Sequence, residues 1–126
     1  MKSHFLTFLF GFMLTVSGQI ALADTQLSEP KPSMDNPRQI VLALNTNDEA
    51  AVNNLLFNVV NIQKFYGQEN VEIAVVGYGA GVRNFLKSDS KVADRIQSLI
   101  LYDVQFVACG NTLDAIGRKR DELIEG

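Results

Sequence analysis

The chain has 126 residues, with 11 Lys and Arg against 14 Asp and Glu and a formal net charge of −3. This mildly acidic balance, without a basic run, predicts no nucleic-acid partner, because phosphate backbones require a positive footprint. One cysteine excludes an internal disulfide, a CxxC redox pair and a cysteine-rich metal site. The length is that of one globular domain.

The first 23 residues have the pattern of a Sec signal peptide. Lys2 precedes an apolar run rich in phenylalanine, and the run closes with Ala21-Leu22-Ala23. An uncleaved membrane anchor is the alternative, since this run is nearly long enough to span a bilayer. The Ala-x-Ala site and the polar residues near the end of the run favour cleavage after Ala23. The sequence therefore predicts a periplasmic or secreted protein with no membrane attachment after cleavage.

Cleavage after Ala23 removes the only histidine, His4. Without histidine the chain cannot build a Ser-His-Asp triad, a Cys-His dyad or a His-ligated zinc or haem site. The prediction is accordingly that there is no metal site and no cofactor. A small exported domain with one thiol remains.

Residues 24–37 contain all three prolines and few large apolar side chains, which predicts a flexible leader. Residues 38–126 alternate apolar runs typical of buried strands with amphipathic helical patterns, which predicts βαβ units and a parallel α/β sheet. The first helix is expected to begin with a capping box formed by Thr46 and Glu49. Strands are predicted over 39–44, 71–76 and 104–108, full helices over 52–66, 92–100 and 113–124, and a short helical stretch over 82–86.

The end of the chain is unusual for such a fold. The first strand is apolar nearly throughout, as in strands that are buried on both faces of a parallel sheet. Three parallel strands alone leave two open edges and a thin core. Either partner subunits cover the edges or the sequence is truncated at Gly126, and we favour a C-terminally incomplete domain.

Cys109 is the main chemical candidate. It follows a predicted strand and precedes a helix, at the sheet edge where reacting groups of α/β proteins collect. Asn111 or Thr112 is expected to cap that helix, whose positive end lowers the pKa of a nearby thiol, and Gly110 leaves the sulfur uncovered. The alternative is a packed structural cysteine, since free cysteine is often buried.

Two further groups are expected at the same edge of the sheet. Gly77, Gly79 and Gly81 form a turn after the second strand, but their spacing is not that of a dinucleotide-binding loop. We interpret this turn as a close backbone approach, with a small anionic ligand as the alternative. Asn45 ends the first strand, and it either belongs to the helix-capping region or lines a pocket near Cys109.

Residues 104–113, around Phe-Val-Ala-Cys-Gly-Asn-Thr-Leu, together with residues 71–81, resemble the DsrE/DsrF-like family, and more narrowly its exported branch. The resemblance implies a flavodoxin-like three-layer α/β fold that assembles into homo-oligomers or hetero-oligomers. In sulfur-relay members a cysteine at this position carries a persulfide and passes it to a partner protein. Cys109 is the matching residue.

Two functions from different classes follow. In the first, the protein is an exported sulfur carrier or transfer protein in which Cys109 forms a persulfide, so that its partners include a sulfur donor or acceptor protein. In the second, it is a non-catalytic oligomeric module with a structural cysteine, which binds a small ligand or protein at the polar strand ends. The site residues predicted beside Cys109 are Gly110, Asn111, Thr112, Asn45 and Gly79.

Overall fold

The computed structural model describes residues 26–126. The predicted signal peptide and its cleavage site lie outside the described residues, so both stay predictions. Residues 26–37 precede the first strand and form one isolated bridge between Ser33 and Asn36. Arg38, the first strand residue, donates hydrogen bonds to the carbonyl oxygens of Ser28 and Pro30.

A parallel three-stranded sheet in the order β1-β2-β3 forms the centre of the fold. Its strands are β1 (Arg38–Leu44), β2 (Val71–Gly77) and β3 (Val104–Ala108). In the parallel register Leu44 lies opposite Gly77, and Gly77 lies opposite Ala108. The carboxyl ends of all three strands therefore meet at one edge, as the strand pattern of the sequence predicts.

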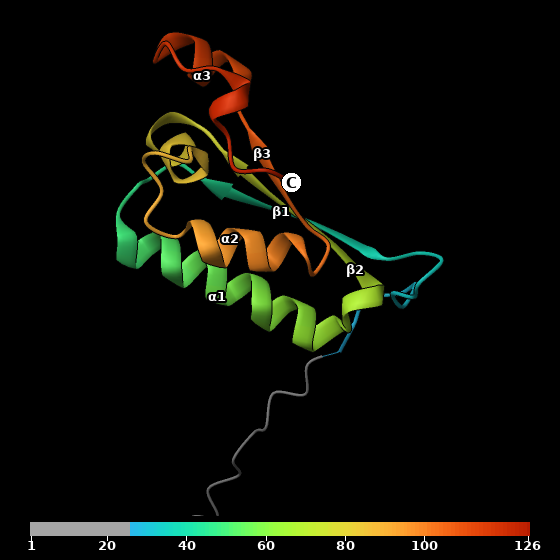
Figure 1. Ribbon diagram of the computed structural model, residues 1–126. Coiled ribbons are helices and arrows are strands. Elements are labelled where there is room, and N and C mark those ends of the chain that lie inside the picture. Colours follow the sequence, from blue (N-terminus) through green and yellow to red (C-terminus); the bar gives the residue numbers. More distant parts are fainter. Residues whose placement is uncertain (1–25) are drawn as a thin grey trace, which may run out of the picture.

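Two helices cover one face of this sheet. They are α1 (Glu49–Tyr66) and α2 (Ala93–Ile100), which lie side by side in Figure 1. Parallel crossover connections are right-handed, so two successive crossovers in the same direction place both helices on the same face. The core between this layer and the sheet is mainly aliphatic and includes Leu56, Val59, Val75 and Ile96, together with the buried ring of Phe85.

The opposite face of the sheet is uncovered in the described part of the chain. Val41 is 70% exposed and Val107 is 44% exposed, and both lie on that face. The expectation that the first strand is buried on both faces is therefore wrong for residues 26–126. Its apolar run is continuous, but only Ile40, Leu42 and Leu44 face the helices.

The helix caps differ from the sequence prediction. Asp48, and not Thr46, caps α1, because its carboxylate accepts a hydrogen bond of 2.9 Å from the Ala51 N–H. The Thr46 hydroxyl instead accepts from the Asp48 N–H. The predicted capping box does not form at α1: the cap lies two residues later than expected, and a carboxylate takes the capping role that the Thr46 hydroxyl was expected to have.

The third predicted helix is much shorter than its apolar spacing suggests. It forms α3 (Gly110–Ala115), which Figure 1 shows beyond the end of β3. The chain then turns through Gly117, which has a φ of 67°. Leu123 and Ile124, which were expected on this helix, lie in an extended segment. In that segment Leu123 forms a β-bridge with Leu86, and the Ile124 N–H donates a hydrogen bond to the Phe85 carbonyl.

Arg118 fixes this returning segment to the rest of the domain. Its guanidinium pairs with Glu122 at 2.7 Å and with Asp89 at 3.3 Å, and it also donates to the Ser88 hydroxyl. The hydrogen bond from Ser88, and then the charges of Arg118 and Arg83, lower the pKa of Asp89. The Arg118 side chain is only 23% exposed, and it connects the two segments.

A 3₁₀ helix over Gly79–Phe85 takes the place of the predicted short helix. It passes so close to the end of β1 that a Cβ on Gly81 would overlap the Leu44 carbonyl oxygen. The close approach predicted for the glycine turn is thus an approach to the protein's own backbone.

We expect Gly81→Ala to lower the free energy of unfolding by about 2 kcal/mol, because backbone must move to admit the methyl group. Chemical denaturation measures this change. Gly110→Ala is the matched control, since a Cβ there would meet no atom within 4 Å, and its change should stay within about 0.5 kcal/mol. Equal effects of the two substitutions would contradict the packing argument.

Candidate functional site

Cys109 lies between β3 and α3, at the position that immediately precedes the helix. Its N–H donates to the Gly77 carbonyl at 2.9 Å, which extends the pairing of β2 with β3 by one residue. Its own carbonyl accepts from the N–H groups of Thr112 and Leu113, both at 3.1 Å. The backbone of Cys109 is therefore fixed on both sides, and the side chain has a defined position.

The structure corrects the prediction of the helix cap. Cys109 itself is the capping residue, whereas Asn111 and Thr112, the predicted caps, lie in the first turn of α3. The difference matters because the cysteine side chain now occupies the place where a capping oxygen usually meets the free N–H groups. Gly110 is the first helical residue, and a Cβ there would meet no atom within 4 Å.

The surroundings of the sulfur lower the pKa of the Cys109 thiol. The Thr112 hydroxyl has the largest effect, followed by the Thr112 N–H, while the Asn111 N–H adds a smaller lowering and partial burial opposes them. The neutral side chain makes no capping hydrogen bond. We infer that these polar groups act mainly on the thiolate once it forms, because a charged sulfur is the stronger acceptor.

The Thr112 hydroxyl also connects this site to β2. It accepts a hydrogen bond of 3.3 Å from the Gly79 N–H. Because the hydroxyl oxygen is engaged as an acceptor from Gly79, its proton is available to the sulfur. Gly79 has a φ of 53°, in the left-handed region that favours glycine. Three predicted site residues, Gly79, Thr112 and Cys109, thus meet at one place.

The other predicted site residues, Gly110, Asn111 and Asn45, contribute no side-chain hydrogen bond to the site. Asn111 is exposed and acts through its backbone N–H, and Gly110 begins the helix. Asn45 is exposed at the end of β1, which β2 separates from β3. The backbone carbonyl of the neighbouring Thr46 accepts a hydrogen bond of 2.8 Å from the side-chain amide of the buried Asn84. This bond ties the segment after β1 to the 3₁₀ helix and not to the turn around Cys109. The assignment of binding roles to these residues stays a prediction.

A cation was an alternative source of thiolate stabilisation. Arg83 and Lys87 are the cations that follow β2, but Arg83 pairs with Asp89 at 2.9 Å and Lys87 pairs with Glu125 at 3.3 Å. Neither of them affects the pKa of Cys109. The low thiol pKa therefore arises from neutral N–H and O–H groups.

Two findings concern other kinds of site. Within residues 26–126, no group of three His, Cys, Asp or Glu side chains is placed to hold a metal ion. Over the same residues, no helix is both long enough and apolar enough to cross a membrane.

Thr112→Val should raise the thiol pKa, because it removes the hydroxyl that most stabilises the thiolate. The pH profile of Cys109 alkylation measures this: its midpoint should move to higher pH, and the rate at neutral pH should fall. Thr46→Val is the matched control, since that hydroxyl serves Asp48 and is expected to leave the profile unchanged. An unmoved midpoint in Thr112→Val would remove the assigned role of the hydroxyl.

Comparison with known proteins places the chain in a family. Among solved structures, it is similar to the protein of unknown function MTH1491 from Methanobacterium thermoautotrophicum. The two chains are 34% identical, the match covers 70% of this chain and 77% of that one, and the TM-score is 0.66. A search of curated proteins found no match. The profile of the DsrE/DsrF-like family matches residues 19–126, which include the whole sheet and Cys109. The chain belongs to the DsrE/DsrF-like family.

Proposed function

We propose that this protein is a sulfur carrier that holds a sulfane sulfur as a persulfide on Cys109. Membership of the DsrE/DsrF-like family supports a sulfur-relay type of role at the level of the family. The observation that carries the proposal for this chain is the half-exposed Cys109 thiol with its lowered pKa. A thiolate that solvent can reach is the nucleophile that sulfur exchange requires.

The transfer is a displacement at sulfur without net oxidation. The Cys109 thiolate attacks the terminal sulfur of a donor persulfide, a new S–S bond forms, and the donor's S–S bond breaks. The donor leaves as a thiolate that takes up a proton. In the second half, an acceptor thiolate attacks the terminal sulfur of the Cys109 persulfide and restores the Cys109 thiolate.

The polar groups around Cys109 suit both halves of this cycle. They stabilise the thiolate that attacks in the first half and leaves in the second. The first turn of α3 also presents N–H groups that would stabilise the negative charge of a bound persulfide. No group of the chain besides Cys109 needs to change its covalent state.

A non-catalytic binding module is the second candidate. One observation favours it: the Cys109 side chain packs partly against the small apolar cluster of Val82, Leu86 and Leu113. In that case the cysteine is a structural residue, and its thiol should resist alkylation until the protein unfolds.

Intact-mass measurement after exposure to a polysulfide tests the proposed function. The wild-type chain should gain whole sulfur atoms that a reductant removes, and Cys109→Ser should gain none. Thr112→Val keeps the sulfur atom and should load more slowly at neutral pH. An unmodified wild-type thiol that is also protected from alkylation in the folded state would favour the binding module instead.

We also propose that the protein is exported and forms homo-oligomers. Export rests on the N-terminal sequence pattern. Assembly is supported by the uncovered face of the sheet, because parallel sheets almost always have both faces covered. Val41 is 70% exposed on this face, so a second copy that packs there would bury it.

Light scattering tests the assembly. We expect a molar mass at least twice that of one mature chain, and Val41→Glu should lower it by placing a charge in the interface. Leu101→Glu is the control, since Leu101 is 82% exposed in the segment between α2 and β3, away from this face. A wild-type mass of one chain would contradict the proposal.

A further inference from the structure

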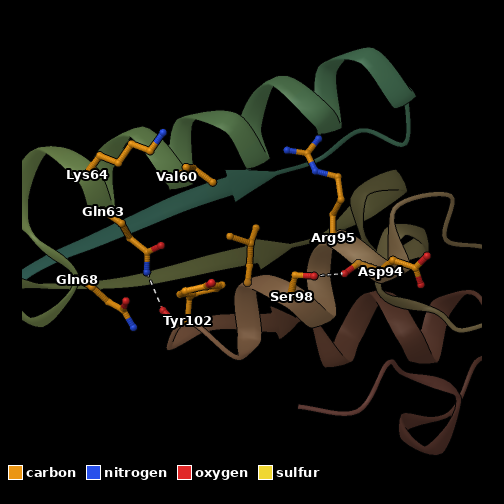
Figure 2. Close-up of a pocket in the computed structure, with 9 residues that line it drawn as sticks. Val60, Gln63, Lys64, Gln68, Asp94, Arg95, Ser98 and Tyr102 are labelled. Atoms are coloured by element: carbon orange, nitrogen blue, oxygen red, sulfur yellow. Dashed lines mark hydrogen bonds between the residues drawn. The ribbon is translucent and has the colours of Figure 1, made fainter.

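A groove between α1 and α2 lies on the side of the helices away from the sheet. Its volume is about 610 Å³, within the range of roughly 300–1,000 Å³ typical of small-molecule sites. Figure 2 shows the side chains that line it, and most of the lining is apolar. The lining residues are Val60, Gln63, Lys64, Gln68, Asp94, Arg95, Ser98, Leu99 and Tyr102.

Two contacts between the helices cross the groove. Arg95 bonds to the Asn53 side chain, and its guanidinium lies 4.5 Å from the centroid of the Phe57 ring. Farther along the helices the Gln63 amide donates to the Tyr102 carbonyl at 2.7 Å, one of the dashed contacts in Figure 2. Because these contacts cross the groove, it suits a short molecule better than a helix of a partner protein.

The middle of the groove is open because the side chains there are small. Val60 of α1 and Ser98 of α2 line it, and the Ser98 hydroxyl turns back to donate to the Asp94 carbonyl at 2.8 Å. The buried Leu99 also lines the groove. This arrangement leaves an apolar surface that no described side chain covers.

The charges at the rim favour an anion. Among residues 26–126, neither Lys64 nor Arg95 forms an ion pair. Asp94, the one acidic residue in the lining, lies in the first turn of α2, where the helix dipole already offsets its charge. The groove therefore presents two cations beside apolar surface in a chain whose formal net charge is −3.

We propose that this groove binds a small amphipathic organic anion. The apolar body lies over Val60 and Leu99, and the carboxylate pairs with the Lys64 ammonium group. Arg95, held by Asn53 and Phe57, adds positive potential without having to move. This site is separate from Cys109, and the proposal does not depend on the function proposed for that residue.

Octanoate is a suitable probe, and octanol is its uncharged counterpart of equal chain length. In an amide NMR titration of the isotopically labelled full chain, octanoate should shift residues of α1 and α2 around the groove in a saturable manner. Lys64→Gln should weaken binding about fivefold, the scale of one partly exposed ion pair. Ser98→Phe should abolish binding by filling the middle of the groove.

Lys31→Gln is the matched control, because it makes the same charge change in the segment before β1 and should leave binding unchanged. Octanol should bind more weakly than octanoate. Equal binding of octanol, shifts confined to the exposed sheet face around Val41 and Val107, or no saturable shift would each overturn the proposal. A folded Ser98→Phe variant that still binds octanoate at the same residues would overturn it as well.

Discussion

Three consecutive residues at the carboxyl end of β2 determine how the site is built. The Gly77 carbonyl accepts from Cys109, and the Tyr78 N–H donates to the Leu44 carbonyl at the end of β1. The Gly79 N–H then donates to the Thr112 hydroxyl. One short segment of the central strand thus fixes the ends of both neighbouring strands and the first turn of α3.

The requirement for glycine in this segment follows from the same geometry. A Cβ on Gly77 would overlap the Phe85 ring, and a Cβ on Gly81 would overlap the Leu44 carbonyl. The 3₁₀ helix can therefore lie directly against the sheet edge only because these side chains are absent. That packing holds β2 and the turn after it in place. It thereby positions the Gly79 N–H for its hydrogen bond to the Thr112 hydroxyl.

The chemistry of Cys109 is consequently a property of the fold and not of a charged partner. Neutral N–H and O–H groups favour the thiolate without pairing it with a fixed cation. An arrangement of this kind suits a sulfur that is taken up and released repeatedly.

The sequence predicted those features that depend on local pattern. Alternating apolar runs and helical spacing located all three strands together with α1 and α2, and the place of Cys109 at a strand end followed from them. The predicted length of the third helix was wrong. The prediction rested on a spacing that fits one helical face, that of Leu113, Ile116, Leu123 and Ile124. This spacing gave no sign of the turn at Gly117. A continuous apolar face would need apolar residues at positions 119 and 120, but these positions hold Lys and Arg, which is a sign that the helix ends earlier.

Features that depend on contacts between distant segments could not be predicted. Gly79 and Thr112 are 33 residues apart, and no local pattern shows that they share a hydrogen bond. The groove between α1 and α2 has the same origin, since its cations come from different helices and only the folded chain brings Lys64 and Arg95 to one rim. Cys109 lies between β3 and α3, whereas the groove lies between α1 and α2. The groove and the surroundings of the thiol share no residue, so substitutions at Lys64 or Ser98 leave the groups around the thiol intact. Mutation can therefore test the two proposed roles separately.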